Sequence, residues 1–141
     1  MKRKASAIWK GDLKTGKGTI STESGTLSQA QYSFTTRFEN GVGTNPEELL
    51  AAAHAGCFTM ALSAQLGESG IKPEKIETSA TVSFDKQPQG WTITEVYLEV
   101  KAKIPGADPA AFNKAVNEAK TGCPVSRVLN AKITLNAVLE N

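Results

Sequence analysis

The two cysteines of this 141-residue chain, Cys57 and Cys123, are the residues best suited to chemistry. The thiolate form of cysteine is the nucleophile, so a reactive cysteine needs a neighbour that favours ionisation. Cys123 lies between Gly122 and Pro124, at the start of a short predicted helix, where the positive end of the helix dipole favours the thiolate. Cys57 lies within a long apolar stretch, where an inert buried thiol is the alternative. Cys57 therefore needs a cation nearby to be reactive.

Arg37 is the candidate cation, because its guanidinium stays charged and can hydrogen-bond both a thiolate and a carboxylate. Glu47 is the carboxylate that can hold this arginine in place. Each residue also has a simpler interpretation. Arg37 can be a surface residue, and Glu47 can be a first-turn glutamate that only complements the helix dipole. The residue pattern by itself leaves both interpretations open.

The single histidine, His54, lies three residues before Cys57, on the same side of a helix. This spacing allows a Cys–His nucleophile pair of the hydrolase kind, which would depend on His54 and not on Cys123. Neighbours on one rigid helix rarely reach that geometry, so a histidine packed in the core is the favoured interpretation. One histidine and two cysteines show no zinc-ligand spacing, and we predict neither a metal nor another cofactor.

The stretch from Asn45 to Gly67 is predicted to form one long helix that carries the first cysteine. Asn45 can cap it, Pro46 suits its first position, and Gly67 supplies its end. Between Glu48 and Glu68 no residue is formally charged, and small or apolar side chains occur on every side, which is typical of a helix buried all round. A membrane span is the alternative. The many alanines and the scattered polar side chains favour a core helix.

Length and composition fit one domain that spans residues 1–141. Charged residues make up 21% of the chain and the formal net charge is +2, so the sequence carries no strong field for nucleic acid or anionic lipid. The basic start contains no apolar run of signal-peptide length, so we expect a cytoplasmic protein. In that reducing compartment, two cysteines favour free thiols or a cycling redox pair over a static disulfide.

Short β-branched or aromatic segments predict two groups of strands separated by helices. The first group covers residues 7–10, 18–22 and 32–36. The second part contains a hairpin, two helices and a last strand, at residues 76–84, 91–104, 110–121, 124–130 and 132–139. This order predicts the α+β class. Because a sheet of this size covers only one side of the long helix, we predict a homodimer with the long helices at its centre.

Two motifs give the chain a family resemblance. The run from Gly43 to Phe58, GTNPEELLAAAHAGCF, and the run from Gly122 to Ser126, GCPVS, together resemble the osmotically inducible protein C (OsmC) and organic hydroperoxide resistance (Ohr) family. The opening segments WKGDLK and GTISTESG resemble the OsmC branch. The resemblance covers essentially the whole chain. It implies an OsmC-like α+β fold, in which antiparallel sheets wrap around long central helices in an intertwined homodimer.

The resemblance also implies a peroxiredoxin-like thiol peroxidase. Such an enzyme reduces organic hydroperoxides, and hydrogen peroxide more weakly, to alcohols in oxidative and osmotic stress defence. By position, Cys57 matches the family's peroxidatic cysteine, Cys123 the resolving cysteine, Glu47 its glutamate and Arg37 its arginine. The implied cycle passes through a Cys57 sulfenic acid and a Cys57–Cys123 disulfide, which an external dithiol, of the lipoyl type in this family, reduces.

One geometric expectation is independent of the resemblance. Ten helical residues place Glu47 about 15 Å along the axis from Cys57, too far for contact within one helix. A complete site should therefore mix residues from both chains of the dimer. Phe58, Met60 and Phe38 are apolar candidates for a pocket that holds an organic tail. A noncatalytic dimeric module that binds an apolar ligand is the alternative function.

Overall fold

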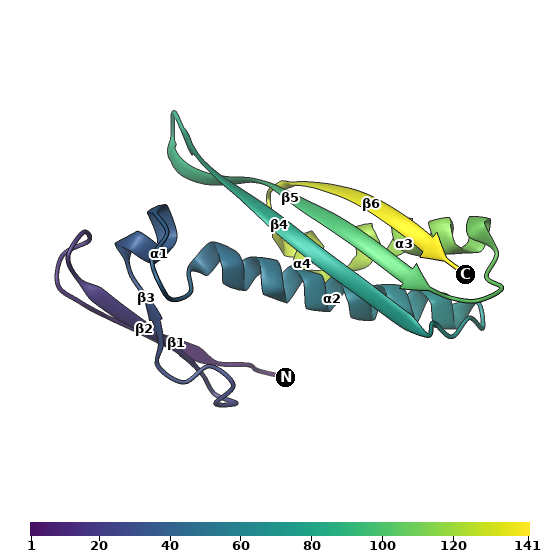
Figure 1. Ribbon diagram of the computed structural model, residues 1–141, viewed down its shortest axis with the longest axis horizontal. Helices are drawn as coiled ribbons and strands as arrows, with labels where there is room; N and C mark the ends of the chain where they lie inside the picture. The colour runs from purple at the N-terminus through teal and green to yellow at the C-terminus, as the bar shows by residue number, and fades with distance from the viewer. The chain divides into compact units, whose positions relative to one another are not determined.

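The computed structural model describes every residue from Met1 to Asn141 (Figure 1). The chain divides into two compact units, Met1–Leu49 and Leu50–Asn141. Its elements in chain order are β1 (Ala5–Lys10), β2 (Lys17–Thr22), β3 (Ala30–Tyr32), α1 (Phe34–Phe38), α2 (Pro46–Glu68), β4 (Lys75–Gln87), β5 (Gly90–Lys103), α3 (Pro109–Gly122), α4 (Pro124–Val128) and β6 (Lys132–Glu140). Two sheets with helices between them in the sequence confirm the α+β class. The single domain over residues 1–141 stays a prediction.

The unit Met1–Leu49 contains a sheet of β1, β2 and β3 in that order, with antiparallel pairing throughout. The rings of Trp9 and Tyr32 lie 5.4 Å apart on this sheet. Gly18 lies next to both rings, and a Cβ atom there would come within 2.4 Å of Tyr32 and 2.6 Å of Trp9. Only glycine fits this position. β1 and β2 confirm the strands predicted at residues 7–10 and 18–22.

The third predicted strand, residues 32–36, is wrong. β3 ends where that segment begins, and Phe34–Phe38 form the helix α1. Ser33 caps this helix: its hydroxyl accepts a hydrogen bond from the backbone amide of Thr36, whose own hydroxyl accepts one from the backbone amide of Ser33 at 2.8 Å. This capping box favours a helix over the strand that the β-branched and aromatic residues indicated. Arg37 therefore lies on a helix.

The long helix α2, Pro46–Glu68, confirms the predicted one. Asn45 caps it, because its side-chain oxygen accepts a 2.7 Å hydrogen bond from the backbone amide of Glu48. The predicted end at Gly67 is wrong. The helix continues for one more residue, and Gly70, with a φ of +70°, makes the left-handed turn that closes it. In that turn the amide of Gly70 donates to the carbonyl of Gly67 at 3.0 Å.

The unit Leu50–Asn141 contains a sheet of β4, β5 and β6 in that order (Figure 1). β4 and β5 are the predicted antiparallel hairpin. β6 returns to pair parallel with β5, so the expectation of antiparallel sheets is wrong for this pair of strands. Asp108 caps α3, as expected, by accepting from the amide of Ala111. Alternate residues of β5 pack against α2 and α3. The core that results consists of Phe58, Leu62, Leu66, Val96, Leu98, Val100, Ala102, Ile104, Phe112, Ala115, Val116, Ala119 and Cys123.

Within this unit α2 buries only one side. His54, Phe58, Leu62 and Leu66, spaced four residues apart, are fully buried, whereas Met60 on another side is 77% exposed. This chain therefore covers one side of the helix that we expected to be buried all round. By length and composition alone, α2 is also long and apolar enough to cross a membrane. The row of buried side chains supports the core-helix interpretation.

Candidate functional site

Cys57 and Cys123 lie in contact, although they are far apart in the sequence. Cys57 lies on α2 and is partly buried, whereas Cys123 lies at the junction of α3 and α4 and is fully buried. Both are free thiols, and their Sγ atoms are 2.9 Å apart. Because the S–S bond of a disulfide is about 2.05 Å long, a shift of about 1 Å joins the two sulfurs. The pair can cycle between dithiol and disulfide without unfolding.

The surroundings of the two thiols shift their pKa values in opposite directions. Burial raises the pKa of the Cys57 thiol above its ordinary value, and the neighbouring Cys123 raises it further. Burial also opposes ionisation of Cys123, but hydrogen bonds from Cys57 and Ser126 outweigh it and lower the pKa of Cys123. When both thiols are neutral Cys123 donates to Cys57; when Cys123 is ionised, Cys57 is the donor. These surroundings favour the thiolate on Cys123, so Cys57 needs a cation to become the nucleophile.

Arg37 and Glu47 form an ion pair. The Nε and Nη2 atoms of Arg37 donate to Oε1 of Glu47 at 3.0 and 2.8 Å. Glu47 is 8% exposed, and its Oε2 is buried without a hydrogen-bond partner. The neighbouring Glu48 is exposed and accepts instead from the hydroxyl of Thr44 at 2.8 Å. The expected contact between this arginine and this glutamate is present, so Glu47 does more than complement the helix dipole.

The four candidate residues thus occur as two pairs, the thiols in the unit Leu50–Asn141 and the ion pair in the unit Met1–Leu49. The guanidinium carbon of Arg37 also lies 5.4 Å from the ring centre of Phe38, which places an aromatic face beside the cation. Of the apolar residues suggested for a pocket, Phe58 belongs to the hydrophobic core, whereas Met60 is exposed.

His54 hydrogen-bonds a serine that follows Cys123 in the sequence. Its Nε2 lies 2.7 Å from the hydroxyl oxygen of Ser126 on α4, and its Nδ1 is buried without a partner. The ring therefore hydrogen-bonds Ser126 and not Cys57, which removes the basis for a Cys–His pair of the hydrolase kind. Ser126 is the residue that the sequence analysis missed. Its position three residues after Cys123, at the start of a short helix, was the available signal.

We expect His54 to make the protein less stable in mild acid. Burial lowers the pKa of His54 below its ordinary value, so the folded chain keeps the imidazole neutral. As the pH falls below about 6.5, the unfolded chain binds a proton that the folded chain does not, and the free energy of unfolding decreases. The neutral His54 side chain therefore makes its full contribution to the free energy of unfolding above about pH 6.5. Urea denaturation at a series of pH values between about pH 8 and pH 5 should show the decrease in the free energy of unfolding. In His54→Gln the free energy of unfolding should depend less steeply on pH. An equally steep loss in the variant would contradict this expectation.

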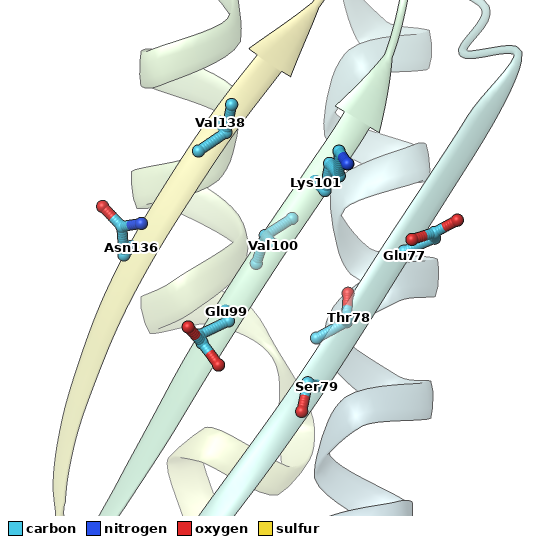
Figure 2. Close-up of a pocket in the computed structure, with 8 residues that line it drawn as sticks. All are labelled: Glu77, Thr78, Ser79, Glu99, Val100, Lys101, Asn136 and Val138. Carbon is cyan, nitrogen blue, oxygen red and sulfur yellow. The ribbon is translucent and has the colours of Figure 1, made fainter.

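A shallow hollow lies on the outer face of the second sheet, away from the helices (Figure 2). The residues that line it are Glu77, Thr78, Ser79, Glu99, Val100, Lys101, Asn136 and Val138. It holds neither a thiol nor a histidine. Elsewhere, no three His, Cys, Asp or Glu side chains are grouped so that they could hold a metal ion. The thiol pair is therefore the arrangement in this unit that can carry out covalent chemistry.

The motifs around both cysteines lie within a region that matches a known family. The model of the OsmC-like protein family matches residues 38–138 of the chain. This chain belongs to the OsmC-like protein family. The matched region of this OsmC-like chain includes Glu47, Cys57 and Cys123, whereas Arg37 precedes it by one residue.

Relatives of this OsmC-like chain carry peroxidase names. Peroxiredoxin OsmC of Escherichia coli K12 is 53% identical over 139 residues, which cover 99% of this chain and 97% of the relative. An organic hydroperoxide resistance protein of Xanthomonas axonopodis pv. citri is 32% identical over 100 residues, covering 70% of this chain and 68% of the relative. The family membership expected from the two motifs is confirmed.

Solved structures show the same fold as this OsmC-like chain. The organic hydroperoxide resistance protein OhrB of Bacillus subtilis superposes with a TM-score of 0.72 at 27% identity, covering 97% of this chain and 98% of the other. An OsmC-like protein of unknown function from Vibrio cholerae superposes with a TM-score of 0.78 at 15% identity, covering 98% of this chain and 99% of the other. This likeness supports the fold alone. The expected OsmC-like α+β fold is confirmed, and the intertwined dimer stays a prediction.

Proposed function

We propose that this protein reduces organic hydroperoxides to alcohols, and hydrogen peroxide more weakly, in oxidative and osmotic stress defence. The observation that carries the proposal is the 2.9 Å contact between the free thiols of Cys57 and Cys123. It occurs in a chain whose relatives are named peroxiredoxin and organic hydroperoxide resistance protein, and these names support a peroxidase enzyme. We place its activity in the cytoplasm, where dithiol reductants keep both cysteines reduced.

In the first step, the Cys57 thiolate attacks the distal oxygen of the hydroperoxide, which carries the hydrogen, and the O–O bond breaks. The sulfur bonds to the attacked oxygen and is oxidised to the sulfenic acid. The other oxygen leaves as an alkoxide and takes up a proton, which gives the alcohol. Overall, one thiol and one hydroperoxide become one sulfenic acid and one alcohol, and the thiol proton ends on the alcohol.

In the second step, the Cys123 thiolate attacks the sulfur of the Cys57 sulfenic acid. The S–O bond breaks, hydroxide leaves and takes up a proton as water, and the disulfide forms. The short distance between the two sulfurs favours this step over attack by a thiol from solution. An external dithiol of the lipoyl type then reduces the disulfide by two exchange reactions and is itself oxidised to a cyclic disulfide.

Arg37 supplies the positive charge that a Cys57 thiolate needs beside it, and Glu47 positions Arg37. The guanidinium stabilises the Cys57 thiolate and hydrogen-bonds the peroxide oxygens as negative charge develops on the leaving one. Glu47 holds the guanidinium through the two hydrogen bonds to its Oε1. The cation lowers the pKa of Cys57, which burial and the neighbouring Cys123 raise, and makes Cys57 the nucleophile.

The working unit is a homodimer whose complete sites mix residues of both chains. The exposed side of α2 is apolar and small, with Ala52, Ala53, Gly56, Met60 and Ala64 exposed, and a second chain would remove it from water. Along α2, Glu47 and Cys57 are ten residues apart, about 15 Å on an ideal helix. An ion pair supplied by the partner chain would overcome this separation.

The reduced protein, mixed with cumene hydroperoxide and dihydrolipoamide, should consume the hydroperoxide catalytically. Consumption of hydrogen peroxide under the same conditions should be slower, because it offers no apolar tail to bind. The measurement is the loss of peroxide over time, with protein alkylated at both cysteines as the control. A rate equal to that of the alkylated control would contradict the proposed function and would favour the noncatalytic binding module.

A further inference from the structure

Two side-chain contacts join α2 to the segment that carries Cys123. Nε2 of His54 lies 2.7 Å from Oγ of Ser126, and Sγ of Cys57 lies 2.9 Å from Sγ of Cys123. His54 precedes Cys57 by three residues on α2, and Ser126 follows Cys123 by three residues on α4. One helical turn therefore separates the two contacts along α2. Where they form, α4 runs antiparallel to α2, and the reaction described above makes no use of His54 or Ser126.

The position of the Cys123 sulfur depends on where α4 lies. This helix has five residues, Pro124–Val128, and a helix so short is not stable by itself. Cys123 at its N-cap makes no side-chain capping hydrogen bond. The backbone of Cys123 is not helical, with a φ of −56° and a ψ of 125°, as expected before a proline. α4 is thus a separate helix that other parts of the fold must hold in place.

The apolar contacts of α4 do not define a single position for it. Val125 and Leu129 pack against the hydrophobic core, whereas Val128 is exposed. Apolar contacts are not directional, so they tolerate small shifts of α4 along α2. The hydrogen bond between His54 and Ser126 is directional, and both residues are buried, at 0% and 8% exposed. A shift of α4 would leave both polar side chains buried without a partner, which is costly.

The hydroxyl of Ser126 is directed at another helix. A serine or threonine within a helix often donates to the carbonyl four residues earlier, as Thr121 does to Asn117 at 3.3 Å. Oγ of Ser126 instead lies within hydrogen-bond distance of the His54 ring on α2. Apolar side chains could fill the same space, but a buried polar pair accepts only one register between two helices. This pair therefore fits a positioning role.

We propose that the hydrogen bond between His54 and Ser126 holds α4 in register on α2 and so keeps Cys123 opposite Cys57 for disulfide formation. His54 and Ser126 are positioning residues, because they act on the sulfurs through the placement of α4. A misplacement of about 1 Å can slow a reaction between held groups about a hundredfold. The role in the second step of peroxide reduction rests on the proposed function, whereas the effect on the thiol–disulfide equilibrium does not.

The equilibrium between the two thiols and their disulfide can be measured with dithiothreitol and without peroxide. The protein dithiol passes two hydrogen atoms to oxidised dithiothreitol, which becomes the reduced form while the protein disulfide forms. Alkylation and mass spectrometry at a series of dithiothreitol ratios give the equilibrium constant. Ser126→Ala and His54→Leu should each lower this constant about tenfold, as expected for one buried hydrogen bond. The two changes combined should lower it no further, because either one already removes the bond.

Two variants serve as controls. His54→Gln keeps a side-chain N–H near the position of Nε2 and should retain most of the wild-type constant. Thr121→Val removes an exposed hydroxyl two residues before Cys123 and should match the wild type. A merely structural pair would destabilise the dithiol and disulfide forms alike and leave the constant unchanged. An unchanged constant in Ser126→Ala, or one as low in His54→Gln as in His54→Leu, would overturn the proposal. If His54→Leu does not fold, Ser126→Ala decides the matter by itself.

Single-turnover reaction with cumene hydroperoxide tests the role in catalysis. Ser126→Ala should slow disulfide formation about tenfold more than it slows formation of the sulfenic acid, because only the second step needs Cys123 in register. Trapping of the sulfenic acid by dimedone, followed by mass spectrometry, measures both rates. An equal effect on the two steps would overturn the role in the second one. If the wild type itself forms no sulfenic acid, the proposed function fails, and the dithiothreitol equilibrium still decides whether the hydrogen bond positions the thiols.

Discussion

Cys57→Ser should lower the rate of hydroperoxide reduction to that of the solution without protein, a loss of at least about a thousandfold. A serine hydroxyl is a far weaker nucleophile than a thiolate, and it has no sulfenic acid to form. The fold should be unaffected, since the change replaces one sulfur by oxygen at a partly buried position. The measurement is consumption of cumene hydroperoxide with excess dithiol, at protein concentrations that also allow a single turnover.

The matched control is the other cysteine. Cys123→Ser should still consume about one equivalent of hydroperoxide per chain, because the first step needs only Cys57. Its Cys57 should then accumulate as the sulfenic acid, and turnover with a dithiol should slow. If Cys123→Ser loses the first equivalent while Cys57→Ser retains it, the assignment of the two roles is reversed.

Arg37→Met should slow the first step by two to three orders of magnitude, about the cost of removing one preorganised donor from a transition state. Without the guanidinium, burial and the neighbouring thiol keep the pKa of Cys57 raised, so less thiolate is present at neutral pH. Raising the pH should recover part of the rate. Arg3→Met, on the exposed N-terminal segment, is the matched control and should react as the wild type does.

Glu47→Gln should have a smaller effect, about tenfold, because it weakens the hold on Arg37 and leaves the cation in place. Glu48→Gln, next to it on the exposed side of α2, is its control. If the first step is as fast in Arg37→Met as in Arg3→Met, Arg37 does not assist the reaction of Cys57, whatever the effect of Glu47→Gln.

Mixing two inactive variants tests where the arginine comes from. In a heterodimer of Cys57→Ser and Arg37→Met chains, one site combines an intact Cys57 with an intact Arg37 only if each site takes them from different chains. Each heterodimer should recover about half of the wild-type activity, so a randomly paired one-to-one mixture should recover about a quarter, and sedimentation should show the dimer itself. No recovery would contradict sites that mix chains.

Much of the fold could be predicted because the hydrophobic periodicity and the helix-capping residues indicate the same elements along most of the chain. The hairpin of β4 and β5 and the helix α3 follow from alternation and from the cap at Asp108. The strand expected at residues 32–36 was wrong because a local capping box at Ser33 prevailed over β propensity. A capping signal in a five-residue helix is easily hidden by β-branched neighbours.

The candidate site could be predicted in part. Residue type indicates two possibly reactive thiols, Cys57 and Cys123, and the family resemblance adds the roles of Arg37 and Glu47. The contact between Arg37 and Glu47 is present. The contact between the thiols depends on how α3 and α4 pack against α2, which no local pattern encodes. The same packing turns His54 from Cys57 toward Ser126. It also sets the pKa of each thiol, since burial and neighbours are properties of the folded chain.

The most direct test of the proposed redox pair, Cys57 and Cys123, is the mass of the reduced protein after one equivalent of cumene hydroperoxide. We expect each chain to lose two hydrogen atoms, and peptide mapping to show Cys57 joined to Cys123 in the same chain. Chains that keep both thiols free while the hydroperoxide persists would contradict the proposed redox pair. So would a disulfide that joins cysteines of different chains.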